Sequence, residues 1–240
     1  MNILLVNNSV RGSSGIDAVV KSEERALLRL GHSVHLYTRD NSEFTVARGL
    51  ERTRLALATL YSYRSRREVR ALCAQHAFDV IHFHNLAPLL TGAVYDGTRD
   101  SKAFIVQHLH NYRAFCPAAY AFRHNQFCSD CTRGAFLPCA WHGCYRHSRA
   151  ASSALVMVRW MDWLHGRQSG AAPDAWIAVS SAVSNRSIEP PAFRLIESKH
   201  WIIPLPTWPG SCRNHYGLIS SRPSNSSLPV RSSGQRAQIR

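Results

Sequence analysis

The sequence contains no long apolar run. No stretch approaches the roughly 20 consecutive apolar residues that a membrane-spanning helix needs, and the apolar residues 3–6 are too few for the core of a secretion signal. These absences argue against helical membrane spans and predict a soluble, cytoplasmic protein. The hydrophobic content of 45% over 240 residues is still sufficient to bury the core of one large domain or of two small ones.

Acidic residues are also scarce. The chain has 15 Asp and Glu against 29 Lys and Arg, which gives a formal net charge of +14. Five of the basic residues lie beyond Pro206, where no acidic residue occurs, so the other 24 basic and 15 acidic residues leave a charge of +9. Residues 48–70 dominate this excess with seven Arg. We favour a solvated or membrane-facing basic surface, peripheral to the plasma membrane, over a true polyanion site.

Short apolar runs alternate with amphipathic segments. Residues 2–6 form an apolar run without alternation, as in a strand buried on both faces of a parallel sheet. Apolar residues recur at helical spacing over 16–30, Gly31 stands where a helix cap belongs, and residues 33–37 read as a second strand. This unit predicts an α/β protein with a Rossmann-like, doubly wound parallel sheet.

The alternation continues with one interruption. The pattern predicts further strands at 79–83, 103–107, 175–179 and 200–203, and helices at 49–76, 89–95, 150–165 and near Ser181. Residues 111–149 are rich in Cys, aromatic and Arg residues and have little periodicity, which predicts a Cys-rich insertion with little core of its own. Residues 207–240 have the composition of a disordered tail, either natural or read in a wrong frame after a domain spanning 1–206.

A glycine-containing loop joins the first predicted strand to the first predicted helix. Gly12 and Gly15 lie in this loop, next to the free N–H groups and the positive dipole end of the helix, which favour an anion. The spacing is not the three-glycine fingerprint of dinucleotide-binding proteins. The loop therefore either approaches a phosphate or is an ordinary turn.

Polar residues follow two of the predicted strands. His82 and His84 share one face of the strand at 79–83, and Asn85 comes next. We identify no nearby carboxylate that would complete a metal site around this pair. Because ligands of open α/β sheets bind at the carboxyl ends of the strands, contact with a substrate and a structural role are about equally expected here.

A second polar segment follows the strand at 103–107. It includes His110, Asn111 and Tyr112. An imidazole at the rim of a sheet can hydrogen-bond a sugar hydroxyl or stabilise charge in a transition state, since it titrates near neutrality. The alternative is a histidine that only caps the end of the strand.

The predicted insertion holds five of the seven cysteines, and two of them form a Cys-x-x-Cys pair. In a chain without a secretion signal, such thiols bind zinc more readily than they form disulfides. A structural zinc ion would stabilise the insertion by cross-linking it. The alternatives are free buried thiols and redox pairing of the cysteines. The ligands of this expected site are Cys116, Cys128, Cys131 and Cys144.

Several segments together have a familiar order and spacing. They are residues 1–8 (MNILLVNN), 15–16 (GI), 31–36 (GHSVHL), 78–85 (FDVIHFHN), 109–113 (LHNYR), 116–117 (CP), 144–146 (CYR) and 176–180 (WIAVS). Over about residues 1–205 they resemble the N-terminal domain of family 4 glycosyltransferases, in a bacterial branch with a Cys-rich insertion.

The resemblance implies the N-terminal, acceptor-side half of a GT-B fold. Such enzymes transfer a sugar from a nucleotide-sugar donor to a glycan or lipid-linked acceptor, with retention of configuration and no obligatory metal, often in cell-envelope polysaccharide biosynthesis. By this resemblance Gly12 and Gly15 approach the donor diphosphate. His110 contacts the transferred sugar as the catalytic histidine, and the acceptor or sugar is bound by His84, Asn85, Asn111 and Tyr112.

Two other functions fit parts of the sequence. A zinc-stapled, polyanion-binding module without catalysis would account for the basic charge and the cysteines. A dinucleotide-dependent oxidoreductase would account for the Rossmann-like opening, with Asp40 as the acid that holds a ribose, but the glycine fingerprint is lacking. The order of the strands, with polar residues at their ends, favours the glycosyltransferase, and no specific nucleic-acid partner is expected.

The resemblance also yields a prediction about activity. In the family, the groups that bind the nucleotide and neutralise the leaving diphosphate lie in a C-terminal domain with paired glutamates, which this chain would have to obtain from a missing or separately encoded partner. Loss of that electrostatic stabilisation removes most of the rate. We expect little or no sugar transfer by the purified chain alone, and robust turnover of any nucleotide sugar in a product-release assay would contradict this.

Overall fold

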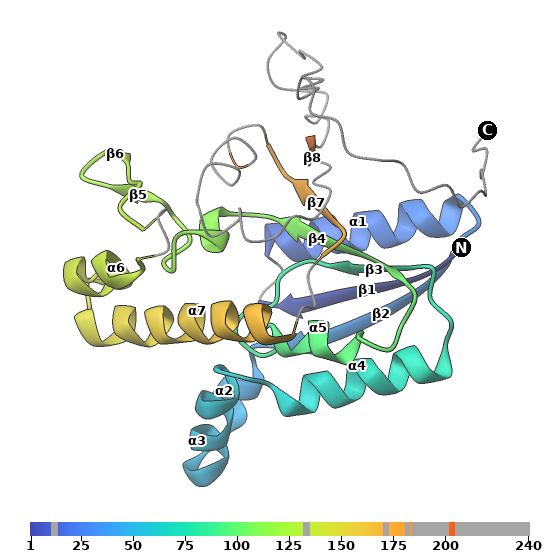
Figure 1. The fold of residues 1–240 in the computed structure, drawn as a ribbon, viewed down its shortest axis with the longest axis horizontal. Coiled ribbons are helices and arrows are strands. Elements are labelled where there is room, and N and C mark those ends of the chain that lie inside the picture. The colour runs from blue at the N-terminus through green and yellow to red at the C-terminus, as the bar shows by residue number, and fades with distance from the viewer. Residues whose placement is uncertain (11–13, 132–134, 170–172, 181–182, 184–201, 205–240) are drawn as a thin grey trace, which may run out of the picture. The chain divides into compact units, whose positions relative to one another are not determined.

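The computed structural model describes residues 1–10, 14–131, 135–169, 173–180, 183 and 202–204 (Figure 1). These residues belong to one compact unit, Met1–Leu205. The strands of the main sheet are β1 (Asn2–Ser9), β2 (Ser33–Asp40), β3 (Val80–Phe83), β4 (Phe104–Leu109), β7 (Ala175–Ala178) and β8 (Ile202–Pro204). The longer helices are α1 (Gly15–Arg29), α3 (Gly49–Ala58), α4 (Tyr63–Gln75) and α7 (Arg149–Ser169), and the shorter ones are α2 (Glu43–Val46), α5 (Ala93–Gly97) and α6 (Leu137–His142).

The sheet has the strand order β2-β1-β3-β4-β7-β8, and all of its neighbouring strands run parallel. Parallel neighbours require crossover connections, which α1, α4 and α5 supply between the first four strands. The predicted α/β class with a parallel sheet is thus confirmed, and the arrangement is compatible with a Rossmann-like fold.

The sheet separates two apolar layers. On one face Ile3 and Leu5 of β1 pack with Val20 of α1. On the other face Leu4 and Val6 belong to the largest core cluster, which includes side chains of α4 and α5. Figure 1 shows α1 on one side of the sheet and α4 and α5 on the opposite side. Because successive residues of a strand point to opposite faces, an unbroken apolar run fits this two-sided burial.

The single helix predicted at 49–76 is wrong, because two helices, α3 and α4, occupy this region. Ser62 begins α4 as its N-cap, and its hydroxyl accepts a hydrogen bond from the backbone N–H of Ser65. The same hydroxyl accepts a hydrogen bond from the buried guanidinium of Arg39, which lies near the end of β2. Because Arg39 holds Ser62 against the sheet, a new helix begins there. The Arg-rich segment therefore does not continue as one helix.

The Cys-rich insertion has more structure than the sequence indicates. It contains a 3₁₀ turn (Tyr112–Ala114), a two-stranded hairpin of β5 (Phe122–Arg123) and β6 (Gln126–Phe127), and α6. Phe115 and Phe136 are almost fully buried and pack in a cluster with Val156 of α7. The expectation of little core was wrong, because aromatic and thiol side chains form a cluster without helical or strand periodicity.

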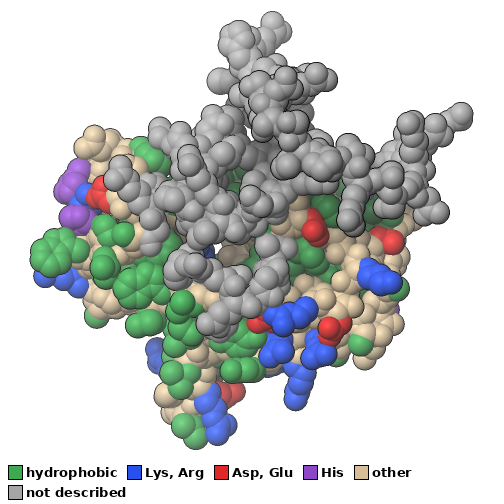
Figure 2. Space-filling view, in the orientation of Figure 1, with side chains coloured by type: hydrophobic (Ala, Val, Ile, Leu, Met, Phe, Trp, Pro, Cys, Tyr) green, Lys and Arg blue, Asp and Glu red, His purple; other side chains and the backbone are tan. Residues whose placement is uncertain are grey.

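The surface over α2 and α3 combines exposed apolar and basic side chains. Figure 2 shows this mixture where the two helices project at the lower end of the molecule. We call it the α2–α3 surface; it consists of Val46, Arg48, Leu50, Arg52, Arg54 and Leu57, all exposed. None of the described helices is both long enough and apolar enough to cross a bilayer.

Some predictions fall outside the described residues. These are the phosphate contact by Gly12, most of the short helix near Ser181, and the tail at 207–240. The remaining elements lie close to their predicted positions, although α5 begins four residues later than expected and α7 extends to Ser169.

Gly97 provides a test of the packing between α4 and α5. A Cβ atom at this position would lie 2.8 Å from the backbone oxygen of Arg66 and 3.2 Å from Cβ of Val69. We therefore expect Gly97→Ala to lower the free energy of unfolding by about 1–3 kcal/mol, since the clash is partly with backbone. Urea denaturation measures this change.

Gly15→Ala is the matched control, because a Cβ atom at Gly15 would meet no atom within 4 Å. We expect its effect to stay within about 0.5 kcal/mol. Equal unfolding midpoints for the two variants would contradict the close approach of α5 to α4.

Candidate functional site

Four histidines gather at the carboxyl edge of the sheet. His82 lies in β3 and His84 directly follows it, while His108 lies in β4 and His110 directly follows that strand. The parallel register places His82 opposite Val106, so the ends of the two strands meet at the same edge. Ile81 and Ile105 point into the core on the α4–α5 side, so the alternating histidines point to the α1 side.

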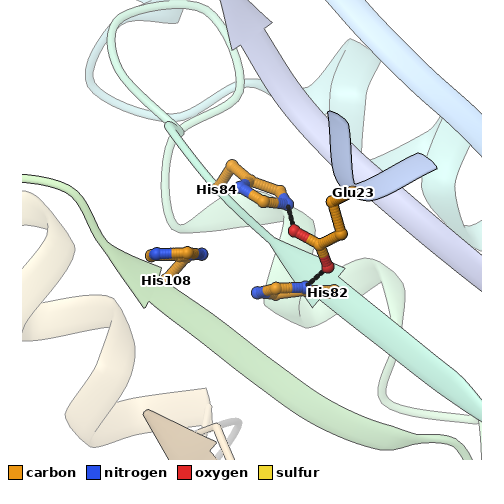
Figure 3. A group of neighbouring side chains, drawn as sticks. All are labelled: Glu23, His82, His84 and His108. Atoms are coloured by element: carbon orange, nitrogen blue, oxygen red, sulfur yellow. Dashed lines mark hydrogen bonds and ion pairs between the residues drawn. The ribbon is translucent and has the colours of Figure 1, made fainter. Parts of the chain in front are cut away.

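Glu23 of α1 lies beside three of these histidines, His82, His84 and His108, as Figure 3 shows. One of its carboxylate oxygens lies 2.6 Å from Nδ1 of His82, and the other lies 3.3 Å from Nε2 of His84. We call Glu23, His82, His84 and His108 the histidine cluster. One ligand atom from each of these four side chains lies within 4.8 Å of the others, which is compact enough for them to share a metal ion.

The imidazole rings contact one another directly. His84 Nδ1 lies 3.1 Å from His110 Nε2, and the centroids of the His108 and His110 rings are 4.1 Å apart in a stacked arrangement. The rings of His82 and His84 are 4.3 Å apart. Two adjacent imidazolium ions repel each other, so the stacking of His108 on His110 disfavours a charge on both rings.

Burial keeps most of these rings neutral. Burial, and to a lesser extent the neighbouring histidines, lower the pKa of His108 to about 2 and that of His110 to about 4. The pKa of His84 is also strongly lowered, chiefly by burial. At neutral pH these side chains are therefore neutral imidazoles, each with one N–H donor and one lone pair. The lone pair can bind a metal, and either nitrogen can hydrogen-bond a hydroxyl.

The other predicted sugar contacts make structural hydrogen bonds. The side chain of Asn85 donates to the backbone oxygen of Asn8, and the Asn8 N–H donates to the backbone oxygen of Asn85. Asn111 accepts a hydrogen bond from the backbone N–H of Arg113 and so caps the 3₁₀ turn. Tyr112 packs against the rings of Phe115 and Phe127. These contacts position the ends of β1 and β4, and sugar binding by the three residues stays a prediction.

A negative charge lies next to the described part of the glycine loop, in the first turn of α1. Asp17 accepts hydrogen bonds from the backbone N–H groups of Val10 and Ser14 and from the Asn7 amide. Burial opposes ionisation of Asp17, but these hydrogen bonds outweigh it and lower the pKa of the carboxyl. Gly15 begins α1 and is exposed, so a diphosphate at Gly15 would lie close to this carboxylate. Diphosphate binding at this loop stays a prediction.

Five cysteines of the insertion line one pocket, together with His142. Burial raises the pKa of Cys131 and that of Cys139 to about 12, which favours protonated thiols in the absence of a metal. Among the described residues these sulfur atoms do not form a group as compact as the histidine cluster. Zinc binding by Cys116, Cys128, Cys131 and Cys144 is therefore a prediction that the geometry leaves open.

Sequence reasoning missed Glu23 as the carboxylate beside His82 and His84. A signal for it was present: Glu23 follows Val20 by three residues and precedes Leu27 by four, so it lies within the apolar stripe of α1. An acidic residue at such a position faces the sheet and needs a polar partner there. Glu23 and His82 are 59 positions apart, so no local pattern in the sequence reveals that partner.

Comparisons with protein-family models, with curated protein sequences and with solved structures each returned no match. The parallel sheet and the histidines at its carboxyl edge are thus the observations from which a function has to be argued.

Proposed function

We propose that this domain is the acceptor-side half of a nucleotide-sugar-dependent glycosyltransferase. The observation that supports this most is the position of His110. It follows the last residue of β4 at the carboxyl edge of a parallel sheet, where α/β proteins bind their ligands. It is only partly buried, whereas His84 and His108 behind it are almost fully enclosed. His110 is the member of this group that a sugar can reach.

The chemistry of His110 fits a sugar hydroxyl. Burial and the neighbouring His82 lower its pKa to about 4, so the ring is neutral at physiological pH. Its Nε2 atom faces His84 Nδ1, and this contact fixes the orientation of the ring. A neutral, oriented imidazole offers directional hydrogen bonding without the cost of desolvating a charge. In the proposed enzyme, donor-side groups from a second domain would stabilise the departing diphosphate.

Ligand-observed NMR tests the proposed role of His110. The probes are UDP-, GDP- and dTDP-sugars and short glycans, and we expect saturation transfer from the protein to the sugar-ring protons. His110→Ala removes one hydrogen bond of about 0.5–1.5 kcal/mol. We therefore expect the affinity for the bound sugar to fall by roughly threefold to tenfold.

His124→Ala is the control for this experiment, because His124 lies exposed in the turn of the β5–β6 hairpin, on the insertion. Its affinity should equal that of the wild type. Absence of saturation transfer to every probe, or the same affinity in the His110 variant, would contradict the proposal.

We further propose that the α2–α3 surface docks on anionic membranes, where a lipid-linked acceptor would lie. Leu50 is 67% and Leu57 is 62% exposed. Arg48, Arg52 and Arg54 form no ion pair with any part of the chain that the structure describes, whereas Arg64 and Arg70 are paired with acids. Exposed leucines beside unpaired arginines are the combination that binds the headgroup region of anionic bilayers.

Vesicle flotation tests this surface. We expect binding to phosphatidylglycerol-containing vesicles and little binding to phosphatidylcholine alone, with a decrease at high salt because the charge attraction is screened. The double variant Leu50→Ser and Leu57→Ser should reduce partitioning by roughly tenfold or more, since each buried leucine contributes about 1.5–3 kcal/mol.

Leu30→Ser is the matched control, because Leu30 is 72% exposed but lies at the end of α1, apart from the α2–α3 surface. This variant should bind vesicles like the wild type. Salt-dependent binding to DNA together with unchanged vesicle binding by the double leucine variant would favour the polyanion-binding alternative.

A further inference from the structure

The histidine cluster contains buried ring nitrogens that form no hydrogen bond with the part of the chain that the structure describes. Neither ring nitrogen of His108 forms a hydrogen bond among the described residues, and the Nε2 atoms of His82 and His84 form none either. The exposed fractions of these residues are 3%, 6% and 2%. Each buried polar group without a hydrogen bond lowers the stability of the fold by about 1–3 kcal/mol. Several such groups in one place therefore indicate a ligand that interacts with them.

A cation can pair with the lone pairs among these atoms. An imidazole ring without an added proton carries one lone pair, so the rings of His82, His84 and His108 can each present a lone pair through a nitrogen atom that forms no hydrogen bond. Glu23 adds a carboxylate on the same side. Although its second oxygen lies 3.3 Å from His84 Nε2, that nitrogen forms no hydrogen bond. Imidazole lone pairs that converge with a carboxylate make a suitable environment for a cation.

We propose that Glu23, His82, His84 and His108 bind a divalent transition-metal ion, with Zn²⁺ as the ion that fits best. Three imidazole nitrogens and one carboxylate oxygen form a four-ligand set, which suits tetrahedral zinc. Calcium and magnesium prefer oxygen ligands and are disfavoured by the same set.

The dimensions of the cluster suit this ion. Zinc–nitrogen bonds of about 2.0–2.1 Å in a tetrahedron place the ligand atoms roughly 3.4 Å apart. The ligand atoms of the cluster lie within 4.8 Å of one another. Side-chain rotations that move these atoms by about one ångström or less would therefore bring them to the tetrahedral spacing. Because β3 and β4 are the central strands of the sheet, the backbone that carries the three histidines need not move.

The burial of the ligands indicates a structural role for the ion. All three histidines are almost fully enclosed, and four protein ligands leave no open position of the kind that catalytic zinc needs. The ion would connect α1 to β3 and β4 through Glu23. It is separate from the cysteine pocket of the insertion, and the inference does not depend on whether the domain binds sugars.

Metal binding by the purified full chain is the first test. The protein is stripped with EDTA and titrated with Zn²⁺ against a chromophoric chelator, and elemental analysis gives the metal content after dialysis. We expect tight binding of zinc at this cluster and a rise in Tm upon its addition, because an ion that binds only the folded state stabilises it.

Cobalt substitution identifies the type of ligand without removing any member of the histidine cluster. Co²⁺ bound to imidazole and carboxylate gives weak visible bands only, whereas bound thiolate adds an intense near-ultraviolet charge-transfer band. Cys131→Ser removes one of the five thiols of the cysteine pocket and so weakens it as a second metal site. In this background we expect one bound Co²⁺ with visible bands and without the thiolate band.

Glu23→Gln and His108→Asn remove ligands while conserving the size or polarity of the side chain. We expect each to lower the zinc affinity of the Cys131→Ser protein by about tenfold to a hundredfold or more. His32→Gln is the matched control, since His32 lies in the turn between α1 and β2, outside the cluster. Its affinity should be unchanged, and circular dichroism verifies that each variant is folded.

Two results would overturn the proposal. One is a stripped Cys131→Ser protein that binds neither Zn²⁺ nor Co²⁺ and shows no change in Tm. The other is metal binding that survives in both Glu23→Gln and His108→Asn with the affinity of the Cys131→Ser parent. Neither result bears on the binding of sugars, which the His110 variant tests separately.

Discussion

Strand β1 is buried on both faces, and covering it determines the positions of most other elements. Leu4, Leu5 and Val6 are fully enclosed, and each such side chain contributes about 1.5–3 kcal/mol when it leaves water. One helix cannot cover both faces. Because β1 pairs in parallel with β2 on one side and β3 on the other, crossover connections supply α1 for one face and α4 with α5 for the other.

The same alternation that builds the core creates the histidine cluster. Ile81 and Phe83 fill the layer under α4 and α5, so His82 and His84 have to point toward α1. His108 and His110 follow the same rule in the neighbouring strand. Polar side chains in a layer that is otherwise apolar have an energetic cost, and Glu23 offsets part of it. A polar cluster retained at such a cost is the feature of this fold that most requires a function.

Much of the sheet could be predicted from the sequence, because an apolar run flanked by loops is a local property. The segments around β1, β2, β3 and β7 were predicted within a few residues. The break between α3 and α4 was not, since it depends on Ser62 meeting Arg39 from a distant strand. The core of the insertion was missed as well, because its members, such as Phe115 and Phe136, follow no periodic pattern.

For the site, the sequence by itself determined which side chains stand at the ends of β3 and β4, because strand alternation and chain order follow from local spacing. Only the tertiary structure decided that His84 meets His110 and that Glu23 lies against His82. The physical reason is that parallel pairing of β3 with β4 and the packing of α1 on the sheet bring together residues 26 to 59 positions apart. No local pattern encodes contacts of that kind, and burial then gives His108 and His110 the neutral state that metal or sugar binding requires.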